Sequence, residues 1–295
     1  EDNKHWKIVH RDQVPQNHQV LPAVWAFRRK RRTSTNEVYK WKARLNIHGG
    51  RQTHGLNFWE THAPVVGWPT IRLFLTLMTL NHWQSRQVDF VLAFPQADIE
   101  CEMYMEVPEG FKVNGSRKDC ALKLERNLHG QKQAGRIWNS HLHDGLIARG
   151  FAQSEVDMCV CYRGSVSLMV HTDDGMFIGP DQEQISECYD LLSKEFVDNE
   201  GNQFRAFKMT DEGTLCDYLG VKITPLKNGA IKLAQPHLIN STLADLGFDP
   251  NKTGTKDTPA PSHVKLTRDL NGKPCEENWS YRSIVGKLNF LEKST

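Results

Sequence analysis

Residues 165–179, SVSLMVHTDDGMFIG, restrict the possible fold of this 295-residue chain more than any other segment. Apolar residues alternate with smaller or more polar ones up to His171, a polar break covers residues 172–175, and an apolar run resumes at Met176. A period of two followed by a short polar break predicts a β-hairpin with two carboxylates at its tip. Strands joined so closely run antiparallel, so we expect an antiparallel sheet.

Strand and helix patterns alternate along the rest of the chain. Further strands are expected at residues 85–94, running into a short helical turn, and at 99–107. Two more hairpins are expected, a basic one at 23–48 and one at 216–235 that turns at Asn228-Gly229. Helical spacing predicts helices at residues 69–80 (buried nearly all round), 134–151, 181–196, 236–248 and 279–293. Antiparallel hairpins mixed with helices indicate an α+β fold, not a doubly wound parallel sheet.

Length and composition fit an ordinary globular chain of one large domain or two to three subdomains. No apolar run approaches the about 18 residues that a membrane-spanning helix needs, and the first residues lack a signal-peptide layout, so we expect no membrane partner. The seven cysteines are odd in number and show no CxxC pair, which indicates reduced thiols in an intracellular protein. A zinc half-site at Cys159 and Cys161 is disfavoured, because no second pair follows at zinc-finger spacing.

Charge is distributed unevenly along the chain. Residues 1–60 carry twelve Lys or Arg against five Asp or Glu, an excess of seven positive charges. Since the net charge of the whole chain is +2, the remaining residues carry −5. A basic front end predicts a polyanionic partner, whereas the acidic remainder would repel one unless its carboxylates bind cations.

The second strand of the basic hairpin alternates strictly between apolar and cationic residues. We expect one buried face, made of Tyr39, Trp41, Ala43, Leu45 and Ile47. The opposite face carries Lys40, Lys42, Arg44 and Asn46. Three cations on one face would bind a triphosphate if the aspartates form a metal site, whereas without the aspartates a solvated strand face is the better explanation. RRKRR at residues 28–32 is either a nuclear-import signal or the outward face of the same hairpin, and we favour the hairpin face.

The carboxylates Asp173 and Asp174 have two explanations. Asp-Gly is a common hairpin turn, so Asp174-Gly175 could serve turn geometry alone. Asp89, however, lies inside an apolar strand between Val88 and Phe90, where a carboxylate is costly unless a cation or a hydrogen-bond network accompanies it.

A divalent cation would account for all three aspartates. Two carboxylates about 4 Å apart repel by about 4 kcal/mol at an effective dielectric constant of about 20, and a bound ion turns this penalty into attraction. Hard oxygen ligands suit Mg²⁺. One aspartate at a strand end and two on a hairpin are what a two-metal phosphoryl-transfer site requires, with one ion activating the attacking hydroxyl and the other neutralising the leaving pyrophosphate.

Several long motifs, in the same order, resemble the reverse transcriptase of copia-type (Pseudoviridae) LTR retrotransposons. They cover roughly residues 20–295 and read KARLNIHGG, ETHAPVVGWPTIRLFL, QVDFVLAFPQADIECEMYMEVPEGF, LKLERNLHGQKQAGRIWN, TDD, DYLGVKI and YRSIVGKLNFLEKST. The resemblance implies a right-hand polymerase with an antiparallel palm sheet, working on an RNA template, a DNA primer and dNTPs. It places an N-terminal segment and fingers at 1–85, a palm at 86–235 with a fingers insertion near 100–135, and a thumb at 236–295.

The same resemblance implies roles for single residues. Asp89 and Asp173 match the metal ligands, Asp174 matches the adjacent acid, and the backbone carbonyl of Phe90 would complete a shell for two Mg²⁺ ions, with Mn²⁺ as an alternative. Phe94 matches the bulky gate that excludes a ribose 2′-hydroxyl; without the resemblance a core aromatic is as good an explanation. The remaining contacts to nucleotide and template fall on Lys42, Arg44, Gly130 and Gln133.

Two positions depart from the pattern of the family. His171 stands where an aromatic residue usually precedes x-Asp-Asp, and Gly135 stands where Pro is common. Neither removes a candidate metal ligand. The final motif, LNFLEKST, continues in the family toward an RNase H domain, so we expect a fragment of a polyprotein that acts inside the cell, in a virus-like particle or the nucleus.

Three functions remain open from the sequence. The leading one is an RNA- and DNA-directed DNA polymerase. A second is a decayed element that binds nucleic acid without catalysis, and the third is another palm-type nucleotidyl transferase or cyclase, which would need no template.

Overall fold

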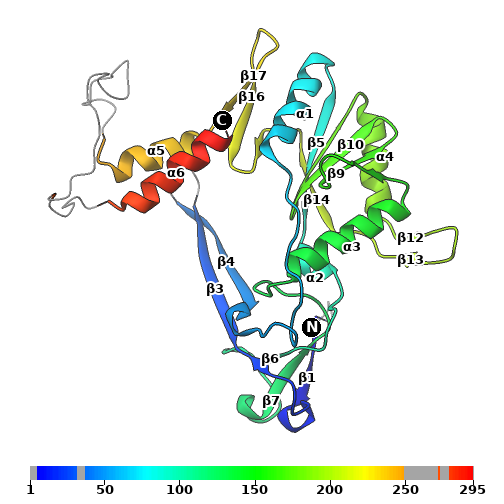
Figure 1. Cartoon of the computed structure of the whole chain (residues 1–295), viewed down its shortest axis with the longest axis vertical. Helices are drawn as coiled ribbons and strands as arrows, with labels where there is room; N and C mark the ends of the chain where they lie inside the picture. The colour runs from blue at the N-terminus through cyan, green and yellow to red at the C-terminus, as the bar shows by residue number, and fades with distance from the viewer. Residues whose placement is uncertain (1–4, 32–36, 249–271, 273–278, 295) are drawn as a thin grey trace. The chain divides into compact units, whose positions relative to one another are not determined.

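The computed structural model describes residues 5–31, 37–248, 272 and 279–294, and Figure 1 shows it as a cartoon. The chain divides into two compact units, Glu1–Leu215 and Cys216–Thr295. The Pro/Thr-rich segment at 249–262, for which its composition predicts a linker, and most of the tip of the basic hairpin lie outside the described residues.

A six-stranded antiparallel sheet organises the first unit. Its strands lie in the order β14-β5-β11-β10-β9-β8, and every neighbouring pair runs antiparallel. The bounds are β5 (Gln84–Phe90), β8 (Ala152–Gln153), β9 (Val160–Arg163), β10 (Val166–His171), β11 (Asp174–Gly179) and β14 (Met209–Gly213). The predicted hairpin at 165–179 is therefore confirmed, as β10 and β11. Mixed helices and antiparallel sheet also confirm the α+β class.

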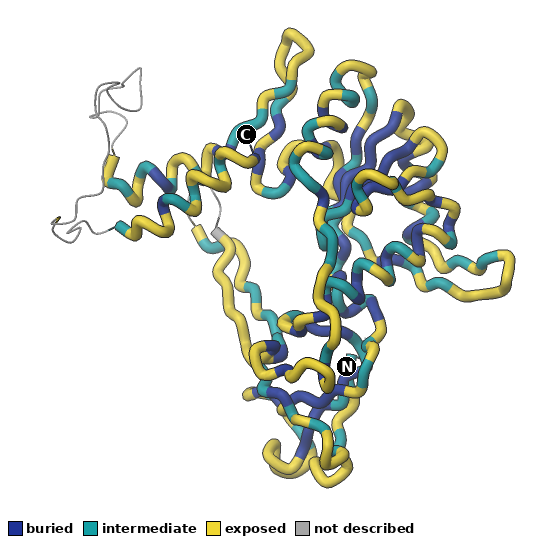
Figure 2. Tube along the Cα trace, viewed as in Figure 1, coloured by how far each residue is buried: buried dark blue, intermediate teal, exposed yellow. Residues whose placement is uncertain are grey.

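Helices cover both faces of this sheet. The main core gathers Trp138 and Leu142 of α3 (Ala134–Ala148) and Ile185 of α4 (Gln182–Leu192) against Val88 and Phe177 of the strands. On the opposite face, Phe74 of α1 (Trp68–Leu80) contacts Tyr162, with 6.5 Å between ring centroids. Figure 2 shows burial concentrated along the strands between these helices.

The helix at 69–80 differs in part from expectation. Its existence is confirmed as α1, but only Ile71, Phe74 and Leu75 are buried, whereas Leu73 and Leu80 are exposed. The prediction of a helix buried all round is wrong, because α1 lies on one sheet face and has solvent on its other side.

A smaller sheet and two separate hairpins, β3–β4 and β12–β13, complete the described part of the first unit. The smaller sheet has the order β1-β7-β6-β2, with β2 and β6 parallel. The basic hairpin is confirmed as the antiparallel pair β3 and β4. The bounds are β1 (Trp6–His10), β2 (Val20–Leu21), β3 (Ala23–Arg31), β4 (Val38–Ile47), α2 (Ala93–Gln96), β6 (Tyr104–Glu106), β7 (Cys120–Leu124), β12 (Phe196–Val197) and β13 (Gln203–Phe204). The strand expected at 99–107 shrinks to β6.

The second unit holds a three-stranded sheet and two helices. The sheet has the order β15-β16-β17, with β15 (Asp217–Tyr218), β16 (Val221–Pro225) and β17 (Ile231–Ala234). Helices α5 (Pro236–Asp245) and α6 (Tyr281–Ser294) confirm the two helices predicted here. The loop between β16 and β17 is longer than the predicted two-residue turn, because Pro225 pairs with Ile231. Within the described residues, no helix combines the length and apolar character needed to cross a membrane.

Candidate active site

The hairpin turn consists of Thr172 and Asp173. His171 pairs with Asp174, so Asp174 and Gly175 already belong to strand β11. Thr172 has φ 59°, a left-handed conformation that is unfavourable for a β-branched residue. Simple Asp-Gly turn chemistry is therefore wrong as an explanation of Asp174-Gly175.

Gly175 is required by close packing between strands. A Cβ atom on it would lie 2.7 Å from Cγ2 of Val88 and 3.2 Å from Cε2 of Phe90. Both of these side chains are buried in the main core. Glycine here lets β11 approach the middle of β5, and this brings the Asp174 backbone against that of Asp89.

Asp89 is explained by the alternation of its strand. Val88 and Phe90 point into the core under α3 and α4, so Asp89 points to the other face of the sheet. In the register of β5 and β11, Asp89 lies directly opposite Asp174. Opposite residues of antiparallel strands share a face, with Cβ atoms about 4.5–5.5 Å apart. The apolar strand thus carries its carboxylate outside the core.

The backbone around Asp173 is held by two hydrogen bonds. The amide of Phe90 donates to the carbonyl of Asp173 at 2.7 Å, which fixes the turn beside the end of β5. The indole Nε1 of Trp138, on α3, donates to the carbonyl of Thr172 at 2.6 Å. Trp138 is almost fully buried, so the turn is anchored to the core.

The three carboxylates interact with one another. Burial, reinforced by Asp173 and then Asp89 and Glu212, raises the pKa of Asp174 to about 6. Burial and the Asp173 carboxylate also raise the pKa of Asp89, while Lys42 and Lys30 act against this rise. The register sets Asp174 opposite Asp89, and electrostatic repulsion links Asp173 to both of them.

The donor set suits a hard cation, although the described residues form no closed metal site. Within the described ranges, no group of three or more His, Cys, Asp or Glu side chains is arranged to hold a metal ion. Burial and, after it, repulsion between carboxylates raise the pKa of Asp89 and of Asp174, and a bound cation would offset both effects. Carboxylate oxygens are also the ligands that Mg²⁺ prefers.

Lys42, on the cationic face of β4, lies within electrostatic reach of these carboxylates. Lys42 is half-buried; its pKa is lowered by burial and by Arg44 and Lys30, and Asp173 and Asp89 oppose this shift. The register aligns Arg28 with Lys42, which extends the cationic face onto β3.

The apolar face of the same hairpin is exposed over its outer half, so the prediction of one buried face is wrong there. Trp41 is 73% exposed and Phe27 75% exposed, whereas Ile47, near the base, is 2% exposed. A two-stranded hairpin has no second layer to cover this face. Trp25 stacks on Phe27, with 5.9 Å between ring centroids, and Arg29 lies over Trp41.

Phe94 lies at the edge of the core beside a histidine that the sequence did not single out. Phe94 is partly buried, and its ring centroid lies 5.1 Å from that of His129. The pKa of His129 is lowered to about 4, mainly by burial and further by the positive charges of Arg44 and Lys42. The negative charge of Asp173 acts in the opposite direction. A neutral imidazole thus lies close to the predicted gate, cations and carboxylates.

Gly130 and Gln133 have structural explanations of their own. Gly130 has φ 92°, and a Cβ atom on it would lie 2.2 Å from the carbonyl oxygen of Ile47. Gln133 is 2% exposed, its amide accepts from Nε2 of Gln52 at 2.9 Å, and it donates to the carbonyl of Asn57 at 3.1 Å. The structure does not bring the Gln133 side chain to the carboxylates, and a nucleotide contact for either residue stays a prediction.

His129 is expected to make the chain acid-sensitive. Its folded-state pKa lies below the usual 6.5, so the unfolded chain binds more protons and stability falls as pH drops from about 6.5 toward 4. His129→Gln should reduce this loss, measured by thermal unfolding at both pH values, and the exposed His62→Gln should not. An equal acid dependence in both variants would contradict the buried, neutral state of His129.

Comparisons with known proteins point in one direction. A sequence model of the family described as "Reverse transcriptase (RNA-dependent DNA polymerase)" matches residues 3–260. The chain is 29% identical over 299 residues to the retrovirus-related Pol polyprotein from transposon TNT 1-94 of Nicotiana tabacum, covering 98% of this chain and 21% of the relative. It is 30% identical to the corresponding polyprotein from transposon RE1 of Arabidopsis thaliana, covering 98% and 19%.

A foamy viral protease–reverse transcriptase, solved in complex with double-stranded DNA, aligns at 13% identity with a TM-score of 0.41, over 84% of this chain and 33% of that one. The chain spans about one fifth of the length of the curated relatives above. Since the family model covers most of the sequence, the chain belongs to the reverse transcriptase family found in the Pol polyproteins of copia-type retrotransposons.

Proposed function

We propose that this chain is an RNA- and DNA-directed DNA polymerase that extends a primer with dNTPs. The observation that carries the proposal is the meeting of Asp89, Asp173 and Asp174 beside Lys42. An acidic cluster facing cations suits a reaction in which a triphosphate is bound and its leaving group is released.

Each side chain has a distinct part in this proposal. Lys42 and Arg44 bind the triphosphate, and their charge offsets the negative charge that develops on the leaving pyrophosphate. Asp89, Asp173 and the backbone carbonyl of Phe90 would hold two Mg²⁺ ions, with Asp174 in support. The ions, when bound, supply charge neutralisation and a lowered pKa for the primer 3′-hydroxyl. Trp138 and Phe90 orient the turn that carries Asp173.

The right-hand assignment belongs to the same proposal. The six-stranded sheet would be the palm, the β3–β4 hairpin part of the fingers, and residues 236–295 the thumb. The exposed Trp41 and Phe27, interleaved with arginines, suit stacking of template bases with phosphates nearby. The full polyprotein would continue into an RNase H domain and act in a virus-like particle or the nucleus.

Primer extension by the purified chain tests the proposal. We expect Mg²⁺-dependent incorporation of dNTPs on both RNA and DNA templates. Incorporation without any template would favour a different nucleotidyl transferase.

Replacement of Phe94 tests its role as the gate. With Phe94→Ala, discrimination between dNTPs and rNTPs should fall by roughly 10- to 100-fold, because the bulk that would meet a 2′-hydroxyl is removed. Phe74→Ala, a core aromatic on α1, is the control that should lower stability without changing selectivity. Unaltered selectivity in Phe94→Ala would leave Phe94 as a packing residue.

A second candidate function is nucleic-acid binding without catalysis, which the exposed Phe27 and Trp41 and the neighbouring arginines of the β3–β4 hairpin would also serve. Salt-sensitive duplex binding with no incorporation in either Mg²⁺ or Mn²⁺ would select this function.

A further inference from the structure

A cavity of about 310 Å³ lies next to the strand that carries Asp89. Val91 and Leu92, which line it, follow directly after Phe90 at the end of β5. Among the described residues, those that line the cavity include none of the residues proposed to contact the incoming nucleotide. These proposed residues are Lys42, Arg44, Phe94, Gly130 and Gln133. The cavity therefore needs its own explanation.

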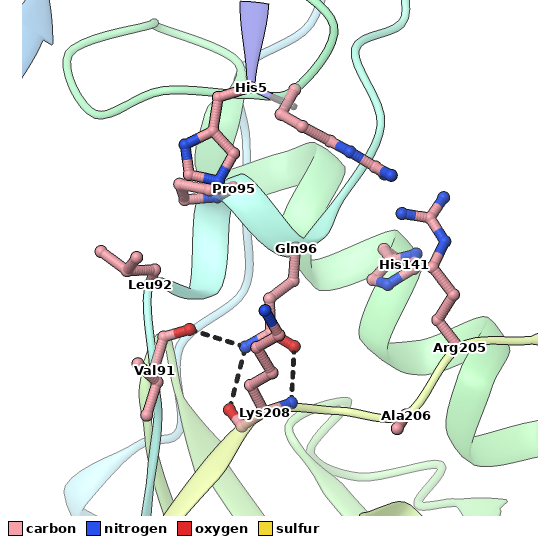
Figure 3. A pocket seen from close by; sticks show the side chains of 10 residues that line it. His5, Val91, Leu92, Pro95, Gln96, His141, Arg205, Ala206 and Lys208 are labelled. Carbon is pink, nitrogen blue, oxygen red and sulfur yellow. Dashed lines mark hydrogen bonds between the residues drawn. The ribbon is translucent and has the colours of Figure 1, made fainter. Parts of the chain in front are cut away.

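Hydrogen bonds preform the walls of this cavity. The side-chain amide of Gln96 donates to the carbonyls of Val91 at 2.8 Å and Lys208 at 3.0 Å, and its oxygen accepts from the Lys208 amide at 2.9 Å (Figure 3). The buried Arg149 donates to the carbonyl of Arg205 at 3.0 Å. Ligand binding here would not have to organise the backbone first.

The polar side of the cavity is cationic. Among the described residues that line it, Arg126, Arg205 and Lys208 are cationic and none is a carboxylate. Asp98, outside the lining, pairs with Arg126 through Nη1 and with Arg205 through Nη2. The two guanidinium groups share this one carboxylate, and each has further N–H donors beyond the one that Asp98 uses.

Flat and apolar groups form the rest of the lining. Figure 3 shows Val91 and Leu92 on one side and His141 and Arg205 on the other, with Pro95 beneath His5. Burial first, and then the nearby cations, lower the pKa of His5 and of His141, so both rings are uncharged near neutral pH. Neutral rings and aliphatic surface suit the face of a base.

We propose that this cavity binds one nucleotide unit, free or within a strand, with its phosphate on Arg126, Arg205 and Lys208 and its base between the apolar wall and the histidines. The volume lies at the lower end of the roughly 300–1,000 Å³ typical of small-ligand sites, which suits a single nucleotide. Guanidinium groups match phosphate oxygens in geometry and charge. The occupant would contact the end of β5, two residues beyond Asp89.

Binding of AMP to the full chain in EDTA tests the proposal by calorimetry. The assay contains neither divalent metal nor primer, so AMP binding does not depend on polymerisation. If the chain proves not to be a polymerase, the AMP-binding result still tests this cavity. AMP should bind, and adenosine should bind at least about 10-fold more weakly. Arg205→Gln and Lys208→Gln should each weaken AMP binding by roughly 10-fold, the loss expected for one charge-assisted hydrogen bond.

Lys118→Gln, an exposed lysine away from the cavity, is the matched control and should bind AMP as the unchanged chain does. Lys42→Gln, in the proposed catalytic site, distinguishes the two sites. Equal weakening in Lys42→Gln would move the nucleotide to the catalytic site and overturn the proposal. Unaltered affinity in both Arg205→Gln and Lys208→Gln would also overturn it.

A competition experiment distinguishes the two sources of the nucleotide. If a 5′-phosphorylated single-stranded oligonucleotide displaces AMP with at least about 10-fold higher affinity, and Arg205→Gln weakens it equally, the unit belongs to a strand. If AMP binds as tightly as the oligonucleotide, the ligand is a free nucleotide. If neither binds, the proposal is wrong.

Discussion

Asp89→Asn is expected to reduce primer extension by at least about 100- to 1,000-fold, the scale on which one electrostatic group in an active site acts. Asp173→Asn should do the same. Asn keeps the size of the side chain but removes the charge that would hold a cation. The measurement is single-nucleotide incorporation on an RNA template, with the exposed Asp119→Asn as the matched control.

Asp89→Asn should not lower stability. Burial and the Asp173 carboxylate raise the pKa of Asp89, so its charged form is disfavoured in the folded chain at neutral pH. Replacement by a neutral amide relieves this penalty, and the melting temperature should stay equal or rise. Loss of activity together with a lower melting temperature would indicate misfolding, and extension at the unaltered rate would remove Asp89 from the active site.

Gly130→Ala is expected to lower both stability and extension. At φ 92° an alanine pays roughly 1–2 kcal/mol of backbone strain. Its Cβ would also lie 2.2 Å from the carbonyl oxygen of Ile47, so backbone must move, at a further cost of roughly 1–3 kcal/mol. The movement would disturb the hydrogen bond of 3.0 Å from the Ile47 amide to the His129 carbonyl.

Gly115→Ala is the matched control for this substitution. Gly115 has φ 94°, nearly the same as Gly130, but nothing lies within 4 Å of its added Cβ. It should show the strain without the clash, and extension should be retained. The free energies of unfolding of the two variants are compared by denaturant titration. Equal values would mean that the close approach of Gly130 to Ile47 of β4 does not affect stability.

The sequence predicted the carboxylate hairpin well because its two strands are adjacent in the chain. A period of two and a short polar break are local signals, and the antiparallel pairing of β10 with β11 needs no distant information. The pairing of β11 with β5 joins segments more than 80 residues apart, and no local pattern in the chain specifies the register that sets Asp174 opposite Asp89.

Alternation alone could not tell which face of β4 is covered. It separates Trp41 from Lys42 correctly, but the assumption that apolar residues turn inward fails where a hairpin has no second layer. His129 and Trp138 were missed as parts of the site for a different reason. Their contacts with Phe94 and Thr172 join residues more than 30 positions apart, and an isolated histidine or tryptophan carries no signal of its own.

Manganese binding tests most directly whether the three aspartates form a cation site. Electron paramagnetic resonance of Mn²⁺, titrated into the chain with primer–template and an unreactive dNTP analogue, counts the bound ions. We predict two ions per chain, with at least one lost in Asp89→Asn and in Asp173→Asn. Equal Mn²⁺ stoichiometry and affinity in the unchanged chain and in both variants would contradict the account.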